Sequence, residues 1–183
     1  TSCAPTYNAK LYAASQTFDE ARHVEAFNKY IQTRIKMMYP IGNELKSMLD
    51  KILTDPRWDL KFIGMQIIIE GLALAAFQSS RELTKDPVLY DMLGLIIRDE
   101  ARHVTFGINY LEEFVETLTE EEKDERAQFA FEACWLSRER LVSTDVFERF
   151  GWDVEEARQF QLGTDVNKYF QKLLFQRVMP NLR

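Results

Sequence analysis

The hexapeptide DEARHV occurs twice in this sequence, at residues 19–24 and again at residues 99–104. The only two histidines of the chain, His23 and His103, both lie inside it. In each copy a glutamate precedes the histidine by three positions, and residues three apart lie side by side on one face of a helix. The repeat therefore predicts two helices that each present a carboxylate and an imidazole together.

Each Glu-x-x-His pair continues a stripe of residues that recur every three or four positions, as one face of a helix requires. The first stripe contains Ala13, Gln16, Glu20, His23, Phe27 and Tyr30. The second contains Leu93, Ile96, Glu100, His103, Gly107, Tyr110 and Phe114. Because the pairs are set in largely apolar stripes, they are expected to point into the protein. Solvated helix faces are the alternative, and they would leave the exact repeat unexplained.

A third glutamate stands in an apolar setting. Glu70 lies in the segment QIIIEGLALAAF, where every other residue from Ile67 to Phe77 is apolar or glycine. An ionised carboxylate is costly to bury unless a cation meets it. No lysine or arginine lies within a turn or two of Glu70, so the cation is expected to be a metal or to come from another helix. A protonated Glu70, or one paired with a distant arginine, is the alternative.

The rest of the sequence predicts helices almost everywhere, because glycine and proline are scarce and apolar residues recur at three and four positions. Long helices are expected over residues 6–35, 56–83 and 87–118, with a short one over 44–53. Asp55 and Asp86 each precede a proline, which predicts an N-cap followed by the first helical residue. No strand is expected.

Beyond these helices, Thr119 and Glu122 form a capping box that starts a helix towards Phe150. Gly151 is its expected end, and two shorter helices follow, one on each side of Gly163. Within the long helix, Glu132 is expected to pair with Arg138 or Arg140. No linker divides the chain, so a single helical domain over residues 1–183 is expected.

Composition argues against several classes of protein. The 23 basic and 29 acidic residues are interspersed and give a net charge of −6, without the basic stripe that binds a nucleic-acid backbone. Cys3 and Cys134 lie far apart and are expected to be free thiols. No uninterrupted apolar run approaches the roughly 20 residues that span a bilayer, and no signal-peptide pattern opens the sequence. A cytoplasmic protein without nucleic-acid or membrane partners is expected.

Two Glu-x-x-His helices and a third helix with a lone inward glutamate make up most of the ligand set of a carboxylate-bridged di-iron or di-manganese site in a four-helix bundle. Imidazole together with carboxylate suits iron or manganese better than calcium or magnesium. Such a site requires one more carboxylate on a fourth helix. That helix is expected upstream of Thr1.

The doubled motif with an intervening glutamate resembles the ferritin-like di-iron carboxylate oxidoreductases. DEARHV is similar to the D-E-x-R-H signature of bacterial multicomponent monooxygenase hydroxylases, ribonucleotide reductase small subunits, acyl carrier protein desaturases and the p-aminobenzoate N-oxygenase group. The resemblance covers roughly residues 6–118. It implies a ferritin-like four-helix bundle with additional C-terminal helices, whose first bundle helix would precede Thr1.

Residue by residue, the resemblance implies a set of metal ligands: Glu20, His23, Glu70, Glu100 and His103. Asp19 and Asp99 match aspartates that accept a hydrogen bond from a ligand histidine. Arg22 and Arg102 would neutralise them, with ordinary surface ion pairing as the alternative. Two departures bear on the branch of the superfamily. Phe27 stands where reductase subunits carry a radical tyrosine, and Ile96 stands where the N-oxygenase pattern has a further histidine.

The expected function is that of a non-haem di-iron oxygenase or oxidase, with two iron ions (or a Mn/Fe or Mn pair), that uses dioxygen to oxidise a small organic substrate. The dry substrate pocket is expected at Phe27, Ala73, Leu74, Phe77 and Gly107. No flavin, haem or nicotinamide fingerprint is present, so electrons would come from a separate reductase or ferredoxin, and a homodimer is expected. The alternatives are iron storage or peroxide scavenging, as in ferritins and rubrerythrins, and a metal-free helical interaction module.

Overall fold

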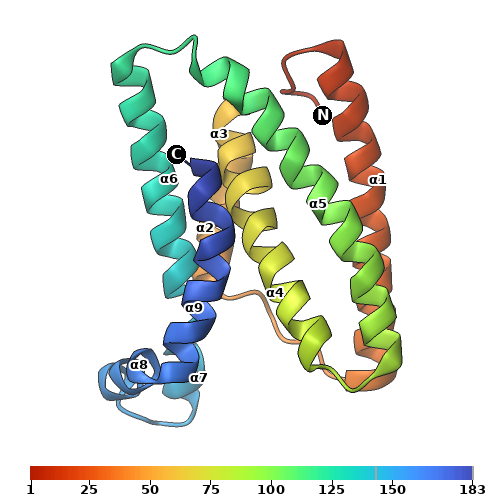
Figure 1. Ribbon diagram of the computed structural model, residues 1–183. Helices are drawn as coiled ribbons and strands as arrows, with labels where there is room; N and C mark the ends of the chain where they lie inside the picture. The colour runs from red at the N-terminus through yellow and green to blue at the C-terminus, as the bar shows by residue number, and fades with distance from the viewer. Residues whose placement is uncertain (143, 183) are drawn as a thin grey trace.

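The computed structural model of the protein describes residues 1–142 and 144–182. The regular elements of these residues are helices, without a strand, which confirms the expected all-α class (Figure 1). In chain order they are α1 (Tyr7–Tyr30), η1 (Ile31–Ile35), α2 (Asn43–Thr54), α3 (Trp58–Phe62), η2 (Ile63–Ile69), α4 (Glu70–Leu83), α5 (Pro87–Val115), α6 (Glu120–Glu139), α7 (Thr144–Arg149), α8 (Val154–Gly163), α9 (Asp165–Val178) and η3 (Met179–Leu182). The elements η1 and η2 are π-helical, and η3 is a 3-10 turn.

The long helix α5 lies between α1 and the rest of the bundle. It packs against α4 on one side and α1 on the other, and both neighbours run antiparallel to it (Figure 1). The helix α9 covers α4, and α2 packs against α6. The short helices α7 and α8 extend from one end of the molecule (Figure 1).

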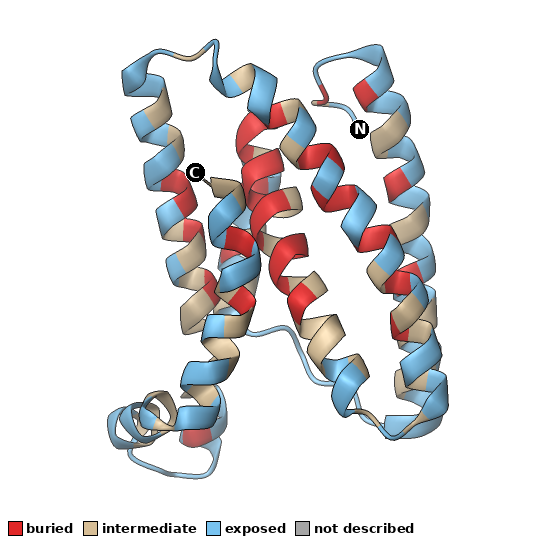
Figure 2. Ribbon diagram, viewed as in Figure 1, coloured by how far each residue is buried: buried red, intermediate tan, exposed pale blue. Residues whose placement is uncertain are grey.

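The core lies along the continuous helical stretch formed by α3, η2 and α4 (Figure 2). Leu60, Ile67, Ile68 and Leu72 on this stretch are almost completely buried. Among the described residues, Trp58–Leu83 is the one helix that is long and apolar enough to cross a membrane, judged by length and composition alone. Its apolar residues do not form one uninterrupted run, so the sequence pattern did not single it out. The central helix of a bundle meets the same criterion, and 56% of the qualifying window is buried within the protein.

The segment η2 was expected to be ordinary α-helix, but it is π-helical. The backbone N–H of Glu70 donates to the carbonyl of Met65, five residues back. Such wide turns are uncommon and occur mostly as local bulges in α-helices. Here the bulge directly precedes Glu70, so it helps to set the direction in which this side chain leaves the helix.

Of the three helix starts that capping residues predicted, at Asp55, Asp86 and Thr119, the structure has two where they were expected. Asp86 caps α5 by accepting from the backbone N–H of Val88, and Thr119 caps α6 in a capping box. The prediction for Asp55 and Pro56 is wrong by two residues, because α3 begins at Trp58. Asp55 instead accepts from the backbone N–H of Arg57 at 2.9 Å and pairs with its guanidinium, which holds the chain in a turn before the helix.

The helix predicted from Thr119 to Phe150 is also shorter than expected. The helix α6 ends at Glu139, where the backbone N–H of Val142 donates to the carbonyl of Glu139, three residues back. Gln161 donates to the carbonyl of Leu141 at 3.1 Å, so a side chain of α8 takes over an acceptor that a continuing helix would use. The turn at Gly151 is as expected, with a left-handed φ of 67°.

Glu132 does not pair with Arg138 or Arg140. Its carboxylate lies 2.5 Å from Lys51 Nζ on α2. The pairing follows from the packing of α2 against α6, which the sequence of α6 alone does not contain.

Candidate metal centre

Three helices bring the predicted ligands together. Glu20 comes from α1, Glu70 from the first residue of α4, and Glu100 and His103 from α5. One ligand atom from each of these four residues lies within 4.8 Å of the others, so the group can hold a metal ion. His23 of α1 faces the same cluster. The sequence predicted each of these five residues as a ligand, and the fold places them at one point.

Both imidazoles turn Nδ1 towards the glutamates. His23 Nδ1 lies 3.5 Å from Glu20 Oε2 and 3.2 Å from Glu100 Oε1. His103 Nδ1 lies 3.3 Å from Glu20 Oε1 and 3.7 Å from Glu100 Oε2. It also lies 3.9 Å from Glu70 Oε2. Glu20 and Glu100 thus offer one oxygen to each histidine, as bridging carboxylates do, whereas Glu70 serves the His103 side.

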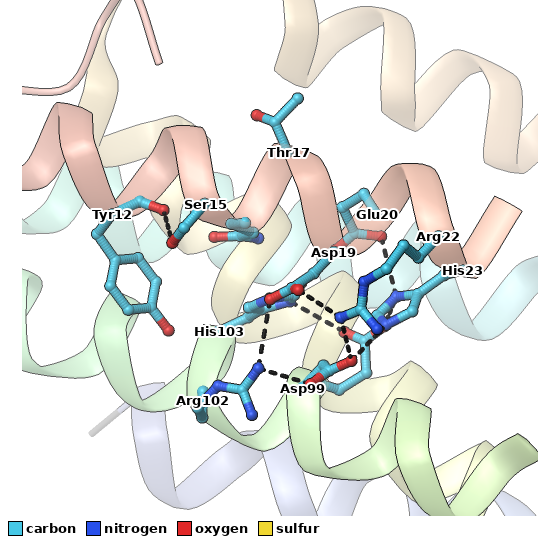
Figure 3. A network of polar contacts seen from close by, with 12 residues as sticks. Tyr12, Ser15, Thr17, Asp19, Glu20, Arg22, His23, Asp99, Arg102 and His103 are labelled. Atoms are coloured by element: carbon cyan, nitrogen blue, oxygen red, sulfur yellow. Dashed lines mark hydrogen bonds and ion pairs between the residues drawn. The ribbon is translucent and has the colours of Figure 1, made fainter.

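The opposite ring nitrogens are held by aspartates of the other hexapeptide (Figure 3). His23 Nε2 lies 3.1 Å from Asp99 Oδ2, and His103 Nε2 lies 3.3 Å from Asp19 Oδ2. An ionised carboxylate only accepts hydrogen bonds, so each Nε2 carries the proton. Each Nδ1 is then the nitrogen available to a metal.

Two arginines neutralise these aspartates. Arg22 Nη2 lies 2.5 Å from Asp19 Oδ1 and 3.1 Å from Asp99 Oδ2. Arg102 Nη2 lies 2.6 Å from Asp99 Oδ1 and 3.3 Å from Asp19 Oδ2. The guanidinium groups are half exposed, whereas the aspartates are largely buried. The network in Figure 3 therefore closes the outer side of both histidines.

The inner side of the cluster contains polar atoms that lack protein partners. His23 Nδ1, His103 Nδ1, Glu70 Oε2 and Glu100 Oε2 are buried and make no hydrogen bond. Buried polar groups are rarely left unsatisfied, because each costs about 1–3 kcal/mol. These four atoms are also the two imidazole nitrogens and two carboxylate oxygens that a metal would use, so the donor set fits metal ions.

In the metal-free protein, protons compensate the charge of the cluster. Burial lowers the pKa of His23 and His103, but the adjacent carboxylates, Glu100 and Glu20 foremost, outweigh it and raise the pKa of each imidazole to about 10. Burial and the charge of Glu100 raise the pKa of Glu70 to about 8. For Glu20, burial raises the pKa, but the two adjacent imidazoles outweigh it and lower the pKa to about 2.

The cluster carries a negative charge that a bound metal ion would compensate. The five carboxylates of the cluster and its aspartates face two guanidinium groups, so three negative charges remain when the histidines are neutral. Oxygen and imidazole nitrogen together suit iron or manganese. No thiolate contributes: both cysteines are free, and burial raises the pKa of the Cys134 thiol to about 11.

The residues predicted to form a substrate pocket fall into two groups. Phe27, Ala73, Leu74 and Phe77 are partly buried, and the ring centroids of Phe27 and Phe77 lie 5.4 Å apart. Gly107 does not leave open space, because a Cβ there would lie 2.4 Å from Gln66 Cβ. The prediction of free volume at Gly107 is therefore wrong.

Sequence reasoning missed one residue at the cluster. Gln16 Nε2 donates to Glu70 Oε1 at 2.6 Å. Its position on the same helix face as Glu20 and His23 was the signal that could have identified it, since a polar side chain on that stripe has to find a buried partner.

Comparisons of the chain with protein-family models, curated proteins and solved structures found no match. The chemical interpretation of the cluster consequently rests on the geometry of its residues.

Proposed function

We propose that this chain carries the metal-binding core of a non-haem di-iron oxidoreductase, which uses dioxygen to oxidise a small organic substrate. The observation that supports this most strongly is the set of four buried ligand atoms that make no hydrogen bond, two imidazole nitrogens and two carboxylate oxygens. Three of their residues, Glu70, Glu100 and His103, belong with Glu20 to the group that can hold a metal ion. Such atoms are costly to bury unless cations satisfy them.

In this proposal the glutamates and histidines hold two ions, together with the carboxylate of a fourth helix that such a site requires. Glu20 and Glu100 would help to hold both, since each directs one oxygen to His23 and the other to His103. Glu70 would bind the ion beside His103. The bound ions would supply redox chemistry towards dioxygen, which no side chain of the chain can provide.

The remaining residues would orient the ligands and limit the access of water. Asp99 and Asp19 fix the proton of each imidazole on Nε2 and keep Nδ1 directed inward. The rings of Phe27 and Phe77, which lie 5.4 Å apart, would provide an apolar wall near the cluster, as expected of a site that protects a reactive oxidant. The side chain of Glu20 is 44% exposed, so small molecules can approach the cluster on this side.

The proposal includes partners that the site does not itself contain. Electrons would come from a separate reductase or ferredoxin, and the protein would act in the cytoplasm as a homodimer. The substrate would be small and largely apolar, in keeping with the wall formed by Phe27 and Phe77.

The direct test is metal analysis of the chain loaded anaerobically with Fe(II). We expect about two irons per chain and an absorption change when air is admitted. His103→Ala should lose the ion on that side, since it removes the imidazole donor. Thr105→Ala is the matched control on α5, because Thr105 is exposed and bonds only to its own helix.

Three outcomes would contradict the proposal. Iron stoichiometry that is the same in His103→Ala and the parent chain would show that the cluster is not the metal site. Many irons per chain in a mineral core would instead indicate storage. Absence of any bound iron or manganese would leave the hexapeptides as an interhelical ion-pair network alone.

A further inference from the structure

Glu70 has two oxygens in different surroundings. Oε1 accepts a 2.6 Å hydrogen bond from Gln16 Nε2. Oε2 is buried without a hydrogen-bond partner and is the oxygen that faces His103 Nδ1. One oxygen is thus held by the protein, and the other is directed to the position of an ion.

Gln16 is itself fixed by its surroundings. It is only 7% exposed, and its Oε1 accepts from Gln66 Nε2 at 3.4 Å. This second contact is long, but it places a hydrogen-bond donor next to the Gln16 oxygen. Because Gln16 Oε1 faces that donor, Gln16 Nε2 is the atom that faces Glu70. The orientation of the Gln16 amide is therefore set from two sides.

Gln66 reaches this position because of two backbone features. It lies within the π-helical segment η2, four residues before Glu70. It also packs against α5 at Gly107, where a side chain would not fit, since a Cβ would lie 2.4 Å from Gln66 Cβ and 3.1 Å from its Cγ. Gly107, Gln66, Gln16 and Glu70 form one line of contacts that ends at the metal centre.

Building on the proposed metal centre, we propose that Gln16 is a positioning residue that restricts Glu70 to ligation through a single oxygen, Oε2. A carboxylate binds a metal through one oxygen or through both. Binding through both would turn Oε1 towards the ion and compete with its hydrogen bond from Gln16, and weakening the contact of a buried amide is unfavourable. The coordination position that Oε1 would occupy stays available to a small exogenous ligand, such as water, dioxygen or an anion.

The test uses Co(II), an air-stable probe whose visible absorption weakens as its coordination number rises, and azide as the exogenous ligand. Gln16→Leu removes the hydrogen bond and replaces the amide with an apolar side chain of similar size. We expect weaker Co(II) absorption, because Glu70 becomes free to bind through both oxygens. We also expect the affinity for azide to fall about tenfold or more, the size of one hydrogen bond to a charged group.

Two further variants make the test specific. Gln66→Leu leaves Gln16 and Glu70 in place and removes only the contact that orients Gln16, so its shift should have the same direction and be smaller. This variant also provides the test if Gln16→Leu does not fold. Gln32→Leu is the control, because Gln32 is exposed and contacts Asn28, away from the cluster.

The outcomes separate this inference from the proposed function. If the parent chain binds no Co(II), the metal centre itself is wrong and the role of Gln16 falls with it. If the parent chain binds Co(II) and both variants keep its spectrum and its azide affinity, the centre stands and the positioning role is refuted.

Discussion

Asp19 and Asp99 contact histidines across the two hexapeptides and not within them. Each lies four positions before the histidine of its own motif, yet each contacts the histidine of the other motif. The ring nitrogen that carries the proton is thus fixed from the opposite helix. Because the tautomer determines which nitrogen can bind a metal, these two aspartates couple the two helices to the chemistry of the site.

This crossing gives a prediction at the residue scale. Asp99→Asn should weaken the ion beside His23, and Asp19→Asn the ion beside His103, each by about 10- to 100-fold, as is typical when the residue that orients a ligand is changed. Titration with Mn(II), followed by electron paramagnetic resonance in the parent chain and in the two variants, measures both effects. If each substitution acts instead on the ion beside the histidine of its own motif, the crossed arrangement is wrong.

At the level of elements, the antiparallel packing of α1 and α5 explains why one hexapeptide appears twice. Two copies of the same motif on antiparallel helices face each other, so the Asp of each copy meets the His and the Arg of the other (Figure 3). The helix that carries Glu70 packs against α5 from its other side. Its position depends on how η2 packs against the rest of the core.

Gly64 in η2 allows a test of this packing. A Cβ at Gly64 would lie 2.6 Å from Ile52 Cδ1 and 2.8 Å from Ile52 Cγ1, and Ile52 is itself buried on α2. Gly64→Ala should therefore lower the free energy of unfolding by about 1–3 kcal/mol, the usual cost of overpacking. Denaturation in urea measures it.

Gly163→Ala is the matched control for this substitution, since nothing lies within 4 Å of a Cβ at Gly163. It should leave stability unchanged or raise it slightly. Equal effects of the two substitutions would contradict the close contact between η2 and α2.

For the molecule as a whole, the cluster makes stability depend on pH and on metal. The pKa of each histidine is raised to about 10, so the imidazolium ions stabilise the fold fully below their usual pKa of 6.5 and lose that effect as pH rises to about 10. The pKa of Glu70, raised to about 8, acts in the same direction between 4.5 and 8. The depressed pKa of Glu20 acts only in acid, where its contribution is lost as pH falls from 4.5 to about 2.

The metal-free chain should therefore unfold at a lower temperature at pH 8.5 than at pH 6.5. Metal binding requires deprotonated ligands, so the rise in unfolding temperature on adding Mn(II) should be larger at pH 8.5. Thermal unfolding followed by circular dichroism at the two pH values measures both. A metal-free chain that becomes more stable over this interval, or a metal effect that shrinks with pH, would show that protons and metal do not compete for the cluster.

Much of the local structure can be read from the sequence because its causes are local. Apolar spacing predicted the all-helical class, and capping chemistry predicted the starts of α5 at Asp86 and α6 at Thr119. The signals failed at two places. At Asp55 the cause is a local contact, because Arg57, two residues on, holds the carboxylate in a turn. At the end of α6 another element intervenes, because Gln161 of α8 donates to a nearby carbonyl.

By itself, the sequence determined which residues share a helix face, and so it identified Glu20, His23, Glu70, Glu100 and His103 as a group of inward polar residues. Only the tertiary structure decided which aspartate serves which histidine, which glutamate oxygens face each imidazole, and that Gln16 holds Glu70. The physical reason is that helix periodicity follows from neighbours three and four positions apart, whereas these contacts join residues some 50 to 80 positions apart and depend on how whole helices pack.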